Sequence, residues 1–183
     1  MAAQGVHRIA RPVARSGPRR RIRPHVVVVA PEVVGAVRRV GGWLFDQATA
    51  GWDVTVLAPG HLDARPLHIL GAHTVDLDSA LVSPQRGPLP QVIAIDAGLC
   101  ATDAHIRRRL LDVVDAGQIE VVVWGEGWPA DPGGDDGSVR HRPSSAALAF
   151  KAQALAAAAA PVDAGAVTER FRTGEMLRRS GRV

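Results

Sequence analysis

The 183-residue chain contains no tyrosine and no asparagine, and it has one lysine (Lys151) and one cysteine (Cys100). A single cysteine excludes a disulfide within the chain and any zinc site built on several cysteines. No apolar run approaches the roughly 20 residues that cross a bilayer, and no apolar stretch of a secretory signal follows the N-terminal arginines. We therefore expect a cytoplasmic protein with no membrane partner. The wealth of Arg, Ala, Gly and Val is typical of a GC-rich bacterial genome.

The aromatic content is also low, at 4%, whereas 46% of the residues are hydrophobic. This hydrophobic share excludes a chain that is disordered throughout, and it means that aliphatic side chains must build the core. A chain of this length supports one domain of ordinary size with extensions, but not two.

Acidic residues are missing from the N-terminal segment. Residues 1–25 contain seven arginines and no Asp or Glu, and residues 164–183 contain five arginines and two glutamates. The segment between them carries ten basic and sixteen acidic residues, a net charge of −6. The formal charge of +4 therefore hides an acidic body with two basic ends, and a pI near 10.8 does not make the body a nucleic-acid binder.

Residues 1–24 show neither helical nor strand periodicity, and their prolines and like charges predict a disordered, Arg-rich arm. A solvated tail is the simplest interpretation of this arm. The alternative is that Arg19, Arg20, Arg21 and Arg23 engage an acidic partner or nucleic acid. Because the arm has no aromatic residue to stack on bases, nucleic-acid binding would be weak, independent of sequence and steeply dependent on salt.

Between residues 25 and 160 the sequence alternates between apolar β-branched runs and amphipathic helical patterns. Short links join them in the order strand, helix, strand, which predicts parallel pairing with right-handed crossovers. We therefore expect one α/β domain over 25–160, a single doubly wound, Rossmann-like or flavodoxin-like, mostly parallel sheet of about five strands with helices on both faces. The expected strands lie at 25–31, 52–60, 73–77, 91–98 and 119–125.

Four helices, of which the one over 64–71 is short, are expected between these strands and after the last one. They run from Val33 to about Gly51, over 64–71, from a cap at Thr102 or Asp103 to Gly117, and from about Ser144 to Ala160. Residues 161–183 are expected to form a basic C-terminal helix or tail. Gly41 and Gly42 inside the first helix disfavour it by about 1 kcal/mol each, which indicates close packing of the helix against the sheet, with the approach of a ligand as the alternative.

Open parallel sheets bind ligands outside the carboxyl ends of their strands. Asp96 and Glu126 would be a catalytic pair at this edge, as acid–base or ligand-orienting groups, with Trp124 or Trp128 as a stacking wall. Loops are polar on any protein, so ordinary turn residues are the alternative, and Trp128 could equally cover the last strand. The candidate ligand-binding residues expected there are Glu32, His61, Asp63, Asp96, Trp124, Glu126 and Trp128.

Motifs of known chemistries are incomplete in this chain. The Gly-x-Gly-x-x-Ala in WGEGWPA (124–130) is followed by prolines and glycines instead of the helix that dinucleotide binding requires. No glycine-rich loop precedes Lys151, and Gly-x-Ser-x-Gly is absent. His68 and His73 are not at the spacing of helical metal ligands, so no metal site is predicted, and the cofactor stays undefined.

Cys100 precedes an expected helix, and a helix N-terminus lowers the pKa of a thiol, so a reactive thiolate is one interpretation. No base is obvious near Cys100 in the sequence. A small, buried packing residue is therefore the favoured interpretation.

Two stretches carry a partial family resemblance. VGGWLFDQATAGWDVTVLAPG (40–60) resembles the first βαβ unit of two-domain glycosyltransferases, but the second, sugar-nucleotide-binding domain is missing. The general layout also resembles response-regulator receiver domains, with Asp96 at the phosphoacceptor position. The acidic pair expected after the first strand is reduced to Glu32, and the late-strand lysine is lacking. This resemblance implies at most a degenerate receiver.

Three classes of function follow from these observations. The leading hypothesis is a non-catalytic or regulatory α/β domain that binds a small molecule or a protein partner, because charge is segregated and no catalytic motif is complete. The first alternative is an enzyme that acts on a polar small molecule with carboxylates at the carboxyl edge of the sheet. The second is weak, sequence-independent nucleic-acid binding through the arm.

Overall fold

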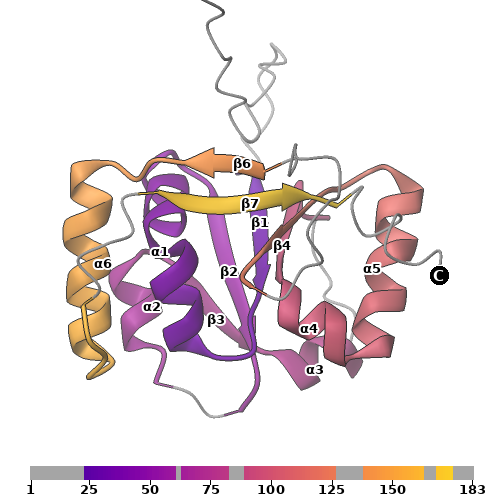
Figure 1. Cartoon of the computed structure of the whole chain (residues 1–183), viewed down its shortest axis with the longest axis horizontal. Coiled ribbons are helices and arrows are strands. Elements are labelled where there is room, and N and C mark those ends of the chain that lie inside the picture. The colour runs from indigo at the N-terminus through magenta and orange to yellow at the C-terminus, as the bar shows by residue number, and fades with distance from the viewer. Residues whose placement is uncertain (1–22, 61–62, 83–88, 127–137, 163–167, 175–183) are drawn as a thin grey trace, which may run out of the picture.

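A computed structural model describes residues 23–60, 63–82, 89–126, 138–162 and 168–174. Within these ranges, seven strands form one mixed sheet in the order β3-β2-β1-β4-β5-β7-β6 (Figure 1). The first five strands in the chain pair in parallel: β1 (His25–Val29), β2 (Asp53–Ala58), β3 (His73–Asp76), β4 (Val92–Asp96) and β5 (Glu120–Trp124). These are the five strands that the β-branched runs predicted.

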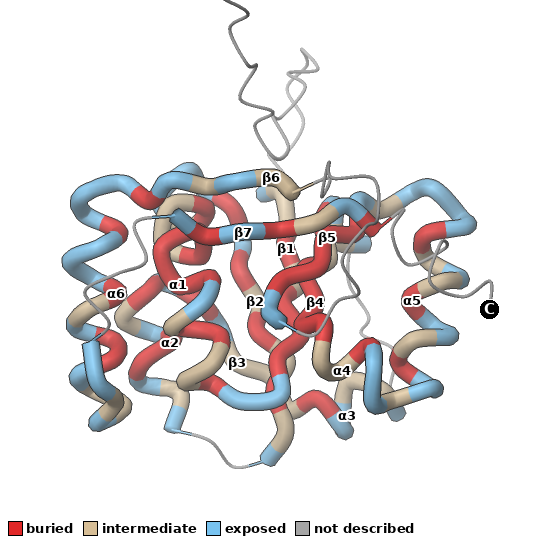
Figure 2. The backbone as a smooth tube through the Cα atoms, in the orientation of Figure 1, coloured by how far each residue is buried: buried red, intermediate tan, exposed pale blue. Residues whose placement is uncertain are grey.

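Helices cover both faces of the sheet, and each face has its own core. Helix α1 (Val33–Thr49) packs on one face with α2 (Arg65–Ile69) and α6 (Ser145–Ala157). The core of the other face is formed with α3 (Leu77–Val82), α4 (Ala97–Thr102) and α5 (Ala104–Ala116). Figure 2 shows the buried residues along the central strands and on the helix sides that face them. Burial on both faces explains why the parallel strands consist of nearly continuous apolar residues.

Local capping signals set the ends of two helices as the sequence predicts. The Asp103 carboxylate accepts hydrogen bonds from the amides of His105 and Ile106 at the start of α5, and Gly117 ends that helix in the left-handed conformation. The Ser144 hydroxyl accepts from the amide of Ala147 at the start of α6.

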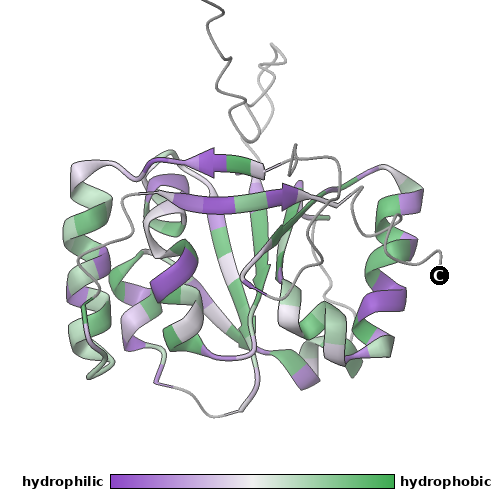
Figure 3. Ribbon diagram, viewed as in Figure 1, coloured by the Kyte–Doolittle hydropathy of each residue, from purple (hydrophilic) through white to green (hydrophobic). Residues whose placement is uncertain are grey.

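The prediction of about five strands is too low, because β6 (Ser138–His141) and β7 (Glu169–Thr173) complete the sheet as an antiparallel pair. Strand β7 lies within the C-terminal segment that was expected to be a helix or tail. Its sequence ERFRT alternates buried and more exposed residues, but charge dominates it, as the hydrophilic colour of β6 and β7 in Figure 3 shows. Phe171 alone supplies the apolar anchor, with its ring 5.0 Å from that of Trp43.

The strand order decides between the two doubly wound arrangements. Strand β1 lies between β2 and β4, so the parallel part has the Rossmann-like order 3-2-1-4-5. A flavodoxin-like sheet, which receiver domains share, would place β3 beside β1. The receiver-like layout is therefore wrong. The sequence could not exclude it, because helices and strands alternate along the chain in the same way in both arrangements.

Several predicted features lie outside the described residues. These are the arm over residues 1–22 with Arg19, Arg20 and Arg21, as well as His61 and Trp128. Among the helices that the structure describes, none combines the length and apolar character needed to cross a membrane.

A buried ion pair fastens β7 to two helices on the α1 face. The ammonium of Lys151 in α6 lies 2.6 Å from the carboxylate of Glu169, and the two residues are 7% and 2% exposed. The same carboxylate accepts hydrogen bonds from the amides of Gly42 and Trp43, at 2.9 Å and 2.7 Å. Interior amides of α1 thus bind a side chain from a strand 127 residues away, which the sequence did not reveal.

Gly42 is required by close packing, as one of the two interpretations of the glycine pair predicts. A Cβ atom at this position would lie 2.6 Å from the ring of Pro143, which precedes α6, and 3.1 Å from Glu169 Oε1. The partner is thus the β6–α6 connection and β7, instead of the face of the parallel sheet.

We expect Gly42→Ala to lower the free energy of unfolding by about 1–3 kcal/mol, since the added methyl group overpacks a buried contact. Gly35→Ala in the same helix is the matched control. Its Cβ would meet the Glu32 side chain, which is exposed and can move, so we expect no loss and up to about 1 kcal/mol of gain in helix propensity. Urea denaturation of both variants measures the difference, and equal effects would contradict the packing argument.

Candidate functional site

The strand order reverses between β1 and β4, and this is where open α/β sheets form a crevice at their carboxyl edge. Glu32 follows β1 and Asp96 ends β4, so both stand at this point. Glu32 is the N-cap residue of α1, but its side chain makes no capping hydrogen bond. It is exposed and bends over Gly35, with Oε1 3.1 Å from the position that a Cβ atom would occupy there.

Asp96 is buried at the same edge and holds two backbone segments in place. Its Oδ1 accepts a hydrogen bond from the amide of Leu99, 3.1 Å away, and so caps α4. Its Oδ2 faces Gly125, where a Cβ atom would lie only 2.6 Å away. Gly125 also has a φ of 97°, which favours glycine. The Asp96 carboxylate therefore packs closely against the backbone immediately before Glu126.

Glu126 extends from the end of β5 into solvent and pairs with α1. Its side chain is 85% exposed, and its Oε1 lies 3.0 Å from Nη1 of Arg39, whose side chain is 41% exposed. Sequence reasoning missed Arg39, because it lies in the middle of α1 and 87 residues before its partner. Nothing in the local pattern distinguishes it from other helical arginines.

The three carboxylates share one edge of the sheet but have separate partners. Asp96 is bound to the first turn of α4, Glu126 is paired with Arg39, and Glu32 lies over the first turn of α1. The link between Asp96 and Glu126 is the backbone of Gly125, against which the Asp96 carboxylate packs. Of this group, Asp96 is buried, whereas Glu32 and the pair of Arg39 and Glu126 present charged atoms to solvent.

The other candidates differ in their surroundings. Trp124 is 2% exposed and belongs to the core on the α1 face, where its strand position is opposite Phe171. Its indole Nε1 is buried and has no hydrogen-bond partner in the described part of the chain. Asp63 is exposed and accepts a hydrogen bond from the amide of Arg65 two residues later, which is a local turn contact.

Cys100 is a buried packing residue with a neutral thiol, as the favoured interpretation predicted. Its side chain lies in the core of the α5 face and is 2% exposed. Burial first, and then the nearby Asp96 carboxylate, raise the pKa of the Cys100 thiol to about 12, although Arg107 acts in the opposite direction. A thiol with this pKa does not supply a thiolate nucleophile near neutral pH.

No group of three or more His, Cys, Asp and Glu side chains could hold a metal ion within the described ranges. His68 is exposed, and Nε2 of His73 lies 4.0 Å from the Asp53 carboxylate.

Comparison with known proteins gives similarity at the level of the fold. No protein-family model matches the sequence, and no curated protein is significantly similar to it. Among solved structures, the A40926 pseudoaglycone deacetylase Dbv21 superposes with a TM-score of 0.53 and 16% identity, over 73% of this chain and 81% of that one. A deacetylase of teicoplanin biosynthesis, solved in complex with teicoplanin, gives a TM-score of 0.51 and 13% identity, over 81% and 97% of the two chains.

Both neighbours are enzymes. They share the fold over most of their length with this chain, and this finding overturns the leading hypothesis of a non-catalytic or regulatory domain. That hypothesis rested on incomplete sequence motifs. At 13–16% identity, motifs need not persist even where the fold is retained. At this identity the likeness shows a shared fold, and the first alternative, an enzyme that acts on a polar small molecule, is the hypothesis left to test.

Proposed function

We propose that this chain is a hydrolase that removes an acyl group from an amide nitrogen of a polar small molecule. The observation that carries the proposal is the fold shared with two deacetylases over 73% and 81% of the chain. The partly exposed pair of Arg39 and Glu126 at the carboxyl edge of the sheet adds the charged groups that such a reaction needs. The single cysteine agrees with a cytoplasmic site of action, which we include in the proposal.

In this proposal Glu126 is the general base and Arg39 stabilises the negative charge. Glu126 would accept a proton from a water molecule as the water oxygen attacks the amide carbonyl carbon. The guanidinium of Arg39 would donate hydrogen bonds to the oxyanion of the tetrahedral intermediate. As the C–N bond breaks, the proton passes to the leaving amine, and the products are a carboxylic acid and an amine. Asp96 acts as a positioning residue through Gly125.

The test measures release of the free carboxylic acid from N-acetylglucosamine, N-acetyl amino acids and an N-acylated glycopeptide by the purified full chain, with and without added divalent metal ions. We expect turnover of at least one compound, and Glu126→Gln should lower kcat at least about 100-fold, as loss of a general base does. Glu120→Gln, at the other end of β5, is the matched control and should retain activity. Absence of turnover across the panel, or full activity of Glu126→Gln, would refute the proposal.

A further inference from the structure

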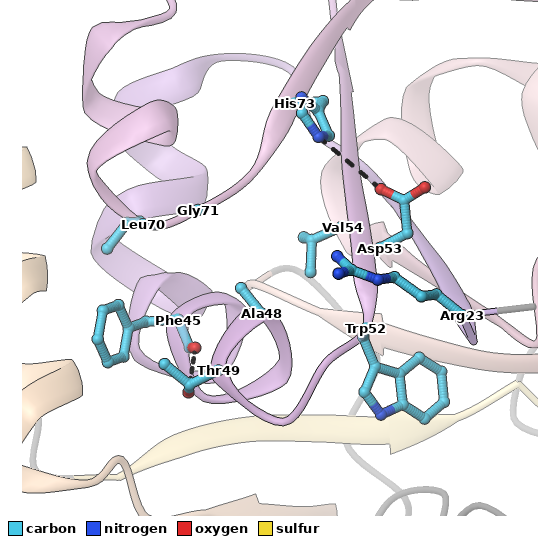
Figure 4. A pocket seen from close by; sticks show the side chains of 10 residues that line it. All are labelled: Arg23, Phe45, Ala48, Thr49, Trp52, Asp53, Val54, Leu70, Gly71 and His73. Atoms are coloured by element: carbon cyan, nitrogen blue, oxygen red, sulfur yellow. Dashed lines mark hydrogen bonds and ion pairs between the residues drawn. The ribbon is translucent and has the colours of Figure 1, made fainter. Parts of the chain in front are cut away.

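A hollow with a volume of about 300 Å³ lies at the amino edge of the sheet, separate from the candidate site (Figure 4). Its walls are the last turns of α1, the entry into β2, the residues that lead into β3, and Arg23 from the segment before β1. Glu32, Asp96 and Glu126 stand at the opposite ends of the strands. This volume is at the lower limit of ligand pockets and is sufficient for a small metabolite.

One side of the hollow presents a cation that is exposed to solvent. In Figure 4 the Arg23 side chain runs between Asp53 and Trp52, and its guanidinium lies beside Val54. Within the described ranges this guanidinium has no hydrogen bond or ion pair. Its planar fork of five donors matches the geometry of a carboxylate, which it would bind through two parallel hydrogen bonds.

A carboxylate lies next to Arg23 on the same side of the hollow (Figure 4). The carboxylate of Asp53 is 51% exposed, and its ion-pair partner in the described part of the chain is His73, at the long distance of 4.0 Å. Helix α1 also ends at this hollow with no basic residue in its last turn, so the negative end of its dipole is not balanced by its own side chains. A ligand cation would therefore be stabilised on this side.

Apolar side chains line the side of the hollow opposite these charges. Phe45, Ala48 and Leu70 line the hollow, and the Phe45 ring is held in place by stacking on Phe150 with 4.5 Å between the ring centroids. We propose that the hollow binds a zwitterionic small molecule of the α-amino-acid class with an apolar side chain. Its carboxylate would bind Arg23, its ammonium would face Asp53, and its side chain would contact Ala48.

The rival explanation is that Arg23 merely balances the negative end of α1. Calorimetric titration of the full chain with L-leucine, leucinamide and 4-methylpentanoate distinguishes the two explanations. Leucinamide lacks the carboxylate and 4-methylpentanoate lacks the ammonium group. We expect L-leucine to bind at least about tenfold more tightly than either analogue, since each loses one charge-assisted interaction.

Substitutions test whether Arg23 binds the carboxylate of the ligand and Asp53 its ammonium group. Arg23→Gln should weaken L-leucine binding at least about tenfold, and this variant should no longer bind L-leucine more tightly than leucinamide. Asp53→Asn should no longer bind L-leucine more tightly than 4-methylpentanoate. Arg65→Gln, an exposed arginine outside the hollow, is the control and should bind as the unchanged chain does. Absence of L-leucine binding, equal binding of the three compounds, or an Arg23→Gln variant that loses thermal stability but binds normally would overturn the proposal.

Discussion

Replacing Glu169 by glutamine is expected to lower the free energy of unfolding by about 3–5 kcal/mol, the largest effect of any single change considered for this chain. The carboxylate is 2% exposed and accepts hydrogen bonds from Lys151 and from the amides of Gly42 and Trp43. Glutamine offers one acceptor oxygen and brings an amide group that cannot accept from these donors. The Lys151 ammonium would then be buried without a counterion. Chemical denaturation monitored by tryptophan fluorescence measures the loss.

Lys151→Met should cause a loss of similar size, because it leaves a buried carboxylate without its cation. The double variant Lys151→Met with Glu169→Gln should lose clearly less than the sum of the two single losses, since the pair acts as a unit. The exposed pair of Arg39 and Glu126 is the matched control, and Glu126→Gln should change stability by no more than about 1 kcal/mol. A Glu169→Gln loss no larger than that of this control would show that the buried pair does not hold β7 in place.

Stability should fall in alkaline solution because of Cys100. Burial first, and then the Asp96 carboxylate, raise the pKa of its thiol in the folded chain from 9.0 to about 12. A group whose pKa is raised by folding contributes stability that is fully present below the unfolded pKa and is lost as the pH rises toward the folded pKa. The free energy of unfolding should therefore decrease by about 1.4 kcal/mol per pH unit above pH 9, and on the order of 4 kcal/mol by pH 12.

Cys100→Ser isolates this contribution, because serine packs similarly and does not titrate in this range. The two proteins share every other titrating group, and the chain has no tyrosine, so the difference between their pH profiles reports on the thiol. Urea denaturation at pH 8–11 measures the free energy of unfolding of both proteins. We expect their difference to be constant below pH 9, and above pH 9 we expect the unchanged chain to lose more stability than Cys100→Ser. Parallel profiles over this range would contradict the burial of the thiol.

The elements that could be predicted from the sequence are those whose signals are local. The run HVVVV predicts β1 because β-branched residues without polar interruptions fit a strand buried on both faces. Asp103 and Ser144 predict the starts of α5 and α6, since an N-cap side chain satisfies amides only two or three residues away. The placement of Glu32 and Asp96 at the carboxyl edge follows from the same local information, because parallel strands share one direction.

Only the tertiary structure decided the strand order, the partners of the polar groups and the two added strands. Strand β7 depends on pairing with β5 and β6 and on one buried ring, that of Phe171, so its charged sequence gave no reason to expect a strand. The contact of Glu169 with Gly42 spans 127 residues, and that of Glu126 with Arg39 spans 87. Such contacts depend on where whole elements pack and not on spacing along the chain. The hollow at Arg23 likewise exists only because α1, β2 and the residues before β3 converge beside it.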